Sequence, residues 1–140
     1  MKLNLGCGKK YIDGWINVDF YDDSKCDVTH DLEEFPWPWE DDSVSEIRII
    51  HTLEHLGADW KVYIKILQEM YRVCEDDALI HVNAPSPWHW NYISDPTHVR
   101  RVTPDGLVYL IHISEPKRRY AISYAVFCLK KTKATMLSLI

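Results

Sequence analysis

The stretch Leu3-Asn4-Leu5-Gly6-Cys7-Gly8, followed by Trp15-Ile16-Asn17-Val18-Asp19, decides the fold of this 140-residue chain. Both parts are short apolar runs; the first ends in two glycines and the second in a carboxylate. Short apolar runs bounded in this way are typical of buried strands. Glycine also lets the backbone approach a ligand closely, because it has no Cβ. The stretch therefore predicts two strands with a binding loop after the first.

A Gly-x-Gly turn after a strand also opens the dinucleotide-binding fingerprint, but the spacing does not fit. That fingerprint needs a third glycine at position 11, which is Tyr11, and an acidic residue about 20 positions further on. Asp19 lies only eleven residues past Gly8. A Rossmann protein that binds NAD or a nucleotide sugar is therefore the weaker alternative. Residues 9–14 are also too few for the usual crossover helix, so we expect a loop between the first two strands.

Further along the chain, several short apolar runs are typical of strands, and one long stretch between two of them has the pattern of an amphipathic helix. Residues 58–74 predict that helix, with Asp59 as its cap. Its apolar positions recur at three- and four-residue spacing: Tyr63, Ile66, Leu67, Met70 and Val73. Thr103-Pro104-Asp105 signals the start of another helix. Further strands are expected at 26–29, 46–50, 78–83, 120–129 and 134–140, with a turn at 130–133. This order predicts an α/β fold with a mostly parallel sheet, which binds ligands beyond the carboxyl ends of its strands.

Composition limits the class of protein. Residues 1–140 suit a single globular domain, with 46% hydrophobic and 26% charged residues. The net charge of −5 argues against nucleic acid or an anionic membrane as the partner. No apolar run approaches the roughly 18 residues of a membrane helix, and no export signal is visible. We therefore expect a cytoplasmic protein, and its four scattered cysteines are expected to be free thiols.

Two predicted loops are rich in tryptophan and proline. They are Pro36-Trp37-Pro38-Trp39 and residues 85–90, with the sequence PSPWHW. Aromatic side chains in loops either line a pocket or fold back onto the core. The sequence leaves both interpretations open for each loop.

Several motifs resemble, in order and spacing, those of class I S-adenosylmethionine-dependent methyltransferases. The chain is most similar to a compact bacterial subgroup in which GWINVD closely follows the first motif. The matching stretches are LNLGCG at 3–8, WINVD at 15–19, THDLEEFPWP at 29–38, SVSEIRIIHTLEHL at 43–56, LQEMYRVCEDDALIHVNAP at 67–85 and DPTHVRRVTPDGL at 95–107. The resemblance implies a Rossmann-like three-layer fold whose helix between the first two strands is missing or reduced. The match fades past residue 107, consistent with a domain trimmed at its C-terminus.

The resemblance also implies a set of cofactor-binding residues for S-adenosylmethionine. The first motif lies under the methionine part, Asp19 takes the ribose hydroxyls, and Phe20 packs beside the adenine. The loop after the third strand reads the adenine edge, and His51 lies next to the methionine part. The full set is Asn4, Gly6, Cys7, Gly8, Asp19, Phe20, Asp31, Leu32 and His51.

The reaction implied is methyl transfer to a small molecule, for instance a sugar or another metabolite. An oxygen or nitrogen acceptor also needs a base, and the sequence offers His98 first and His55 second, with Glu54 and Asp95 nearby. The alternative is that these side chains only hold loops in place. Arg100 is a candidate partner for an anionic acceptor, or an ordinary surface residue.

Two further expectations concern metals and partners. His51 and His55 are four residues apart, and His89 or His98 could join them, but no zinc-binding spacing appears and we expect no metal. The missing helix leaves one sheet face less covered, which a second copy in a homodimer could cover. A non-catalytic module that only binds S-adenosylmethionine is the alternative to an enzyme.

Overall fold

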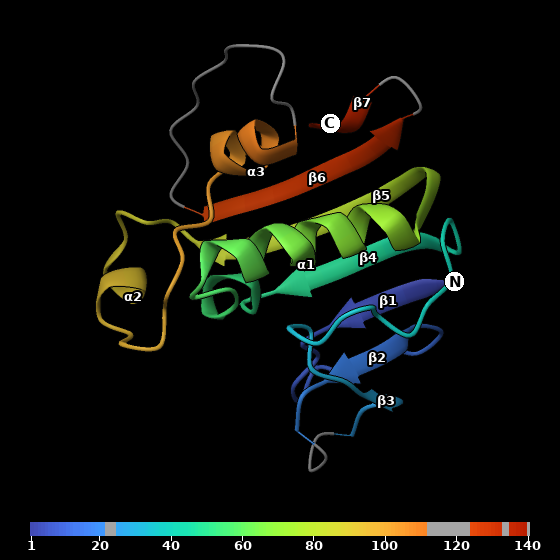
Figure 1. Ribbon diagram of the computed structural model, residues 1–140. Coiled ribbons are helices and arrows are strands. Elements are labelled where there is room, and N and C mark those ends of the chain that lie inside the picture. Colours follow the sequence, from blue (N-terminus) through green and yellow to red (C-terminus); the bar gives the residue numbers. More distant parts are fainter. Residues whose placement is uncertain (22–24, 112–123, 133–134, 140) are drawn as a thin grey trace.

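The computed structural model describes residues 1–21, 25–111, 124–132 and 135–139, with side chains as far as Leu107. Its described strands form one sheet in the order β3-β2-β1-β4-β5-β6-β7 (Figure 1). Their bounds are β1 (Lys2–Leu5), β2 (Ile16–Asp19), β3 (Val28–Thr29), β4 (Val44–Ile50), β5 (Cys74–Pro85), β6 (Tyr124–Thr132) and β7 (Thr135–Leu139).

Strands β1 to β5 pair in parallel, and β6 and β7 pair antiparallel to complete the sheet. The predicted α/β fold with a mostly parallel sheet is thus confirmed. Strand order reverses between β1 and β4, because the chain runs outward from β1 to β3 and then returns to the other side of β1. Such a reversal opens a crevice beyond the carboxyl ends of the two strands, where open α/β sheets bind ligands.

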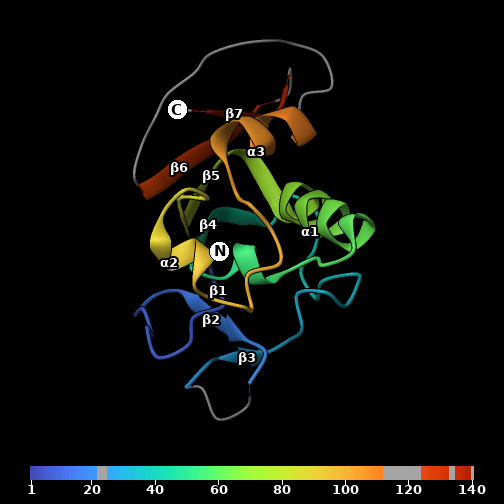
Figure 2. The ribbon, with the colours of Figure 1, turned by 90° about the vertical axis from the view of Figure 1, so that its left-hand side faces the viewer.

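Helix α1 (Trp60–Val73) covers one face of the sheet (Figure 2). It begins where the sequence predicts, since the Asp59 carboxylate accepts a hydrogen bond of 2.8 Å from the Lys61 N–H. Its buried residues are the five whose spacing predicted the helix: Tyr63, Ile66, Leu67, Met70 and Val73. They share one core with apolar strand residues that include Leu3, Leu5, Ile47, Ile49, Ile80 and Val82. Burial of each such side chain contributes about 1.5–3 kcal/mol.

The other described helices are short. They are the 3-10 helix η1 (Leu53–His55) directly after β4, α2 (Trp90–Ile93), which lies beyond the carboxyl ends of the parallel strands, and α3 (Pro104–Ile111) (Figure 1). The start of α3 confirms the signal at Thr103-Pro104-Asp105. No helix in the described ranges is long and apolar enough to cross a membrane.

The opposite face of β1 and β4 is polar. Glu46 on β4 forms an ion pair of 2.7 Å with Lys2 on β1 and a contact of 2.8 Å with the Nε2 atom of His81 on β5. The Lys2 ammonium is the main reason that the pKa of Glu46 is lowered. Polar residues here alternate with buried apolar ones along each strand, so this face is suited to water. The predicted homodimer is not needed to bury it and stays a prediction.

A loop replaces the crossover helix between β1 and β2, as predicted. The Asn17 carboxamide on β2 accepts hydrogen bonds from the Ile12 N–H at 2.9 Å and from Asn4 Nδ2 at 2.8 Å. The Asn17 N–H and Nδ2 both donate to the Asp27 carboxylate, at 2.7 and 2.9 Å. Asn4 Nδ2 also donates to the Lys10 carbonyl at 2.9 Å. Directed hydrogen bonds from buried side chains therefore hold the loop that a helix would otherwise carry.

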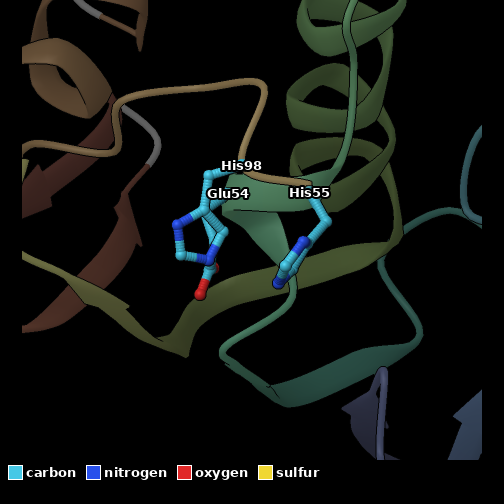
Figure 3. Close-up of side chains that lie close together, drawn as sticks. All are labelled: Glu54, His55 and His98. Carbon is cyan, nitrogen blue, oxygen red and sulfur yellow. The ribbon is translucent and has the colours of Figure 1, made fainter. Parts of the chain in front are cut away.

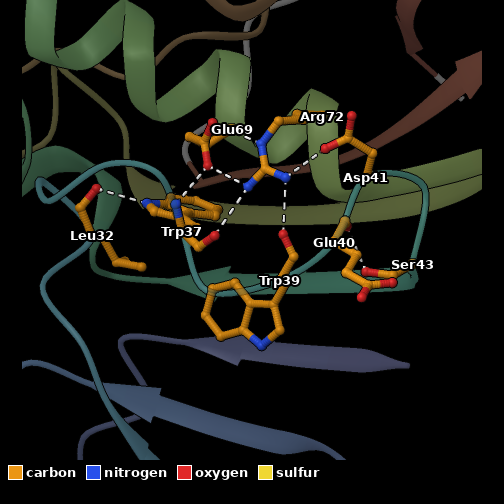
Figure 4. Close-up of polar contacts among 8 residues, drawn as sticks. All are labelled: Leu32, Trp37, Trp39, Glu40, Asp41, Ser43, Glu69 and Arg72. Atoms are coloured by element: carbon orange, nitrogen blue, oxygen red, sulfur yellow. Dashed lines mark hydrogen bonds and ion pairs between the residues drawn. The ribbon is translucent and has the colours of Figure 1, made fainter.

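The two tryptophans of the Pro36–Trp39 loop fold back onto the core, as the second of the two interpretations predicted (Figure 4). Trp37 and Trp39 are buried, and the Trp37 N–H donates to Glu69 at 2.7 Å. Arg72 on α1 donates to the carbonyls of Trp37 and Trp39 and forms ion pairs with Glu69 at 2.6 Å and Asp41 at 2.7 Å. In the second tryptophan-rich loop, by contrast, Trp88 and Trp90 are exposed.

Two element boundaries differ from those predicted, for a reason that strand pairing gives. Strand β5 begins at Cys74, immediately after α1, because Cys74 already pairs with Val44 across a register shift. Strand β6 continues through Thr132, where a turn was expected, because Leu129 to Thr132 pair with β7. The predicted residues 120–123, 133, 134 and 140 lie outside the described residues. Cys7, Cys26 and Cys74 are thiols that form no disulfide within the described residues, as expected.

The ion pair between Glu69 and Arg72 makes the stability of the fold depend on pH. Hydrogen bonds from Arg72, and then from the Trp37 N–H, hold the pKa of Glu69 below its ordinary value of 4.5. A carboxylate with a lowered pKa stabilises the folded state above the unfolded pKa, and this stabilisation is lost as the pH falls through the folded pKa. Glu69→Gln should therefore lower the free energy of unfolding at pH 7 by roughly 1–3 kcal/mol.

Urea unfolding between pH 3 and pH 7 measures this effect. The difference between wild type and Glu69→Gln should shrink below about pH 4.5, the ordinary pKa of the group. Glu75→Gln, at an exposed position on β5, is the matched control. A difference between wild type and Glu69→Gln that stays constant across this range would contradict the assignment.

Candidate functional site

The loops that follow β1 and β4 meet at Gly6. Gly6 has a φ of +63°, a left-handed conformation that favours glycine. A Cβ at this position would lie 2.2 Å from the Oγ1 atom of Thr52, so no larger residue fits without moving Thr52. The Thr52 hydroxyl contacts the Gly6 carbonyl at 3.3 Å. This close approach places both loops at the reversal of strand order.

A cavity of about 240 Å³ opens at this point. It contains five of the nine residues predicted to bind the cofactor: Asn4, Gly6, Cys7, Gly8 and His51. Lys9, Lys10, Arg48 and Ile50 complete its lining. Burial is the main reason that the pKa of the Cys7 thiol rises to about 11, and the Asp19 carboxylate adds to the effect. Cys7 therefore lines the cavity as a neutral thiol at physiological pH.

The Asp19 carboxylate lies against the loop after β1. Its Oδ2 atom accepts a hydrogen bond of 2.7 Å from the Gly8 N–H, and its Oδ1 atom accepts one of 3.1 Å from the Tyr21 N–H. A carboxylate has about four acceptor positions, and the described residues occupy two of those of Asp19. Asp19 thus joins the ends of β1 and β2 and keeps capacity to bind hydroxyl groups.

The backbone of the loop after β1 is largely occupied by its own hydrogen bonds. The Cys7 N–H donates to the Val18 carbonyl at 3.0 Å, and the Lys10 N–H donates to the Cys7 carbonyl at 2.8 Å. Residues 6–15 contain no helix. A pyrophosphate site of the dinucleotide-binding kind needs free N–H groups at a helix N-terminus. This loop therefore offers close approach rather than a phosphate cradle.

Four predicted cofactor residues, Asp19, Phe20, Asp31 and Leu32, are not part of the lining of this cavity, although Asp19 contacts Gly8, which is. Phe20 is 57% exposed and packs edge-on against Tyr21. The Asp31 carboxylate accepts a hydrogen bond from the Glu33 N–H at 2.8 Å, and the Leu32 side chain belongs to the core. Phe20 is free to cover a ligand held by Asp19, whereas Leu32 could contribute only its backbone. Their predicted contacts with the adenine stay predictions.

His51 connects this cavity to a second one. It follows β4 with a φ of +52°, which is uncommon for a residue other than glycine and is often found at functional sites. The second cavity has a volume of about 290 Å³. Its lining is His51, Glu54, His55, Pro85, Asn91, Asp95 and His98. Both predicted catalytic histidines therefore line one cavity, next to the one with the predicted cofactor residues.

Main-chain hydrogen bonds bring His98 to this place. The Glu54 carbonyl on η1 accepts hydrogen bonds from the N–H groups of Val99, at 3.0 Å, and Arg100, at 3.1 Å. The Arg100 guanidinium donates to the Gly57 carbonyl and stacks 4.4 Å from the ring centre of Tyr63. Arg100 thus anchors the segment, and these contacts favour its structural role over the predicted pairing with an anionic acceptor.

Hydrogen bonds select the same tautomer for both histidines. The Nδ1 atom of His98 lies 3.0 Å from the Tyr92 carbonyl, so in the neutral ring it carries the proton. The Nδ1 atom of His55 contacts the Thr97 carbonyl and hydroxyl, at 3.3 and 3.0 Å. The Thr97 hydroxyl donates to Asp95 at 2.6 Å, so toward His55 it acts as an acceptor.

When neutral, both rings therefore leave an unprotonated Nε2 atom, and that of His98 lies 3.7 Å from the Oδ2 atom of Asp95. The ring centres lie 4.7 Å apart, and Figure 3 shows the two rings next to the Glu54 carboxylate. The sequence analysis named His55, His98, Glu54 and Asp95 as candidates. It missed Thr97, whose role depends on a contact between distant segments that no local pattern indicates.

Solved structures share this fold. A methyltransferase from Archaeoglobus fulgidus, described as dependent on S-adenosylmethionine, superposes with a TM-score of 0.67 and 25% identity over 80% of this chain and 58% of its own. The chain has a methyltransferase fold. A putative methyltransferase from Bacillus halodurans gives a TM-score of 0.63 at 15% identity, over 80% of this chain and 60% of its own.

This methyltransferase fold also matches an S-adenosylmethionine-dependent methyltransferase from Methanosarcina mazei, with a TM-score of 0.60 and 16% identity over 97% of this chain and 87% of its own. The match spans less than two thirds of the Archaeoglobus fulgidus and Bacillus halodurans proteins. No protein-family model and no curated protein matches the sequence.

The two glycines of the methyltransferase fold's first loop should tolerate alanine unequally. Gly8 also has a left-handed φ, of +51°, but a Cβ there would meet nothing within 4 Å. Gly8→Ala should cost about 1–2 kcal/mol for the left-handed conformation alone. Gly6→Ala should cost a further 1–3 kcal/mol because of the overlap with Thr52. Urea unfolding of the two variants measures the difference, and equal losses would contradict the contact.

Proposed function

We propose that this protein is a methyltransferase that transfers a methyl group from S-adenosylmethionine to a small-molecule acceptor. One observation carries the proposal: two cavities share His51 at the reversal of strand order. One contains most of the predicted cofactor residues, and the other contains both predicted catalytic histidines. Methyl transfer requires this adjacency, because acceptor, methyl group and sulfur must lie in one line.

The residues that line the first cavity, together with Asp19 and Phe20 beside it, fit S-adenosylmethionine. The left-handed turn at Gly6 and Gly8 lets the methionine part lie close to the backbone. The free acceptor positions of Asp19 suit a pair of ribose hydroxyls, and the exposed ring of Phe20 can cover the adenine. The occupied N–H groups of the loop, and the lack of a helix in residues 6–15, argue against a dinucleotide.

The second cavity supplies what an acceptor needs. S-adenosylmethionine provides an electrophilic methyl group on its sulfur when bound. The lone pair of an acceptor hydroxyl or amine forms the new bond to that carbon, while the electrons of the carbon–sulfur bond go to the sulfur. The Nε2 atom of His98, or that of His55, accepts the acceptor's proton. Asn91 and Asp95 are placed to orient the acceptor by hydrogen bonding.

An enzyme is favoured over a non-catalytic cofactor-binding module for one structural reason. A module needs the first cavity only. The second cavity places two histidines of matching tautomer beside the first, an arrangement without purpose in a protein that only binds the cofactor.

Thermal unfolding tests the cofactor. A ligand that binds only the folded state stabilises it by about 2.7 kcal/mol at 100 times its dissociation constant, which should raise the Tm by roughly 5–10 °C. S-adenosylmethionine and S-adenosylhomocysteine should produce this shift, and NAD should not. Asp19→Asn should weaken binding about tenfold, since it replaces a charged acceptor with a neutral one.

Asp13→Asn removes an exposed carboxylate outside the cavity lining and serves as the control; it should bind like wild type. If neither sulfur compound shifts the Tm at millimolar concentration, the proposed function is wrong. A shift with NAD alone would favour the dinucleotide alternative.

Transfer of a tritiated methyl group from S-adenosylmethionine to the small-molecule fraction of a cell extract tests the second cavity. His98→Gln should lower the rate roughly 100-fold or more, in the range of lost proton-transfer catalysis. His55→Gln should also lower it. His81→Gln, on the polar sheet face outside both cavities, should keep the wild-type rate. Cofactor binding without any labelled product would support the module instead.

A further inference from the structure

We propose that the second cavity binds a divalent transition-metal ion through Glu54, His55 and His98. From the sequence, His51, His55, His89 and His98 have no zinc-binding spacing, and no metal is expected. The structure assembles a different set. One ligand atom from each of Glu54, His55 and His98 lies within 4.8 Å of the other two, although His98 comes from a segment more than 40 residues away (Figure 3).

The buried carboxylate of Glu54 is the strongest evidence for a metal site. Its side chain is 1% exposed, yet neither carboxylate oxygen accepts a hydrogen bond from any described residue. The Nδ1 atom of His51 lies 3.5 Å from Oε1, which is an ion-pair distance when the imidazole is protonated but not a hydrogen bond. A buried carboxylate without a hydrogen-bond partner is costly, and proteins normally pair such a group or use it to bind a metal. Glu54 lines the second cavity, where an ion could reach it.

The two imidazoles are already oriented as metal ligands. Metal-binding histidines usually donate their second ring N–H to a carbonyl or carboxylate, which fixes the tautomer and raises the basicity of the other nitrogen. The Nδ1 atom of His98 is held by the Tyr92 carbonyl, and that of His55 by Thr97. Asp95 extends this arrangement, because its carboxylate accepts a hydrogen bond from the Thr97 hydroxyl.

The geometry favours an ion of the Zn²⁺ or Co²⁺ kind. Bonds of roughly 2.1 Å to nitrogen and oxygen place neighbouring ligands about 3–4 Å apart. A movement of about 1 Å would bring the present 4.8 Å into that range. Imidazole with carboxylate suits these ions, whereas Mg²⁺ prefers oxygen ligands and water. Three protein ligands leave positions open for a further molecule, as in catalytic rather than structural sites.

A role for the ion in methyl transfer rests on the proposed function, whereas binding of the ion does not. An open position next to the cofactor cavity would bind an acceptor oxygen. The ion would lower the pKa of that hydroxyl, so its proton could leave to water before the methyl group is accepted. In the metal-bound protein His55 and His98 would then act through the ion. The preferred acceptors would be molecules with a hydroxyl group and a second oxygen that can chelate.

Calorimetric titration of untagged, chelator-treated protein with ZnCl₂ tests the site. Wild type should bind one ion per chain with a dissociation constant of micromolar or below. Glu54→Gln keeps the side-chain volume but removes the charge, and it should weaken binding at least tenfold, as should His98→Gln. His81→Gln changes a histidine on the polar face of the sheet that does not line the second cavity. It is the matched control and should bind Zn²⁺ like wild type.

NMR of the wild-type protein tests the same site without any variant, so the result does not depend on whether the variants fold. On addition of Zn²⁺, the ¹⁵N resonances of Nε2 should shift in two histidines, assigned to His55 and His98, while their Nδ1 atoms stay protonated. No binding at equal concentrations of ion and protein, shifts in other histidines, or unchanged affinity in a folded Glu54→Gln variant would each overturn the proposal.

The two proposals fail separately. Titrations with Zn²⁺ in the absence of S-adenosylmethionine test only the metal, and the thermal shift with S-adenosylmethionine in the presence of chelator tests only the cofactor. If the metal binds, labelled methyl transfer should fall at least tenfold in chelator and return with Zn²⁺ or Co²⁺. Metal binding without this dependence would leave the ion site standing and remove its role in the reaction.

Discussion

The contact between Gly6 and Thr52 is the constraint on which the rest of the site depends. It joins the loop after β1 to the loop after β4 so closely that no side chain fits at Gly6. Because strand order reverses between these strands, the same contact sets the position of His51 and of η1 behind it. The first cavity forms on one side of His51 and the second on the other. A single close approach of the Gly6 backbone to the Thr52 side chain therefore sets the spacing between the candidate cofactor and acceptor sites.

Local patterns predicted the parts of this arrangement that depend on local chemistry. The spacing from Tyr63 to Val73 predicted the buried face of α1, and the position of Gly6 at a strand end placed it correctly in the crevice. The cluster of Glu54, His55 and His98 could not be predicted, because main-chain N–H groups of Val99 and Arg100 dock that segment. Every residue except proline has such a group, so the docking leaves no signature in the sequence.

The position of the Pro36–Trp39 loop could not be predicted from local sequence either. Whether Trp37 lines a pocket or joins the core is decided by Glu69 and Arg72, which lie on a helix more than 30 residues away. The loop between β1 and β2 could be predicted, because the segment is too short for a helix. The contacts that hold this loop could not be predicted. Buried hydrogen bonds of Asn17 take the place of the packing that a helix would provide.

Glu54 has two roles at once, one through its carbonyl and one through its side chain, which links the proposed reaction to the integrity of the second cavity. It holds the amides of Val99 and Arg100, while the side chain of the same residue faces His98. Any motion that lifts this segment from η1 separates His98 from Glu54 and admits bulk water to a buried carboxylate. In the proposed reaction, loss of this docking would therefore open the second cavity and separate the reacting groups in the same step.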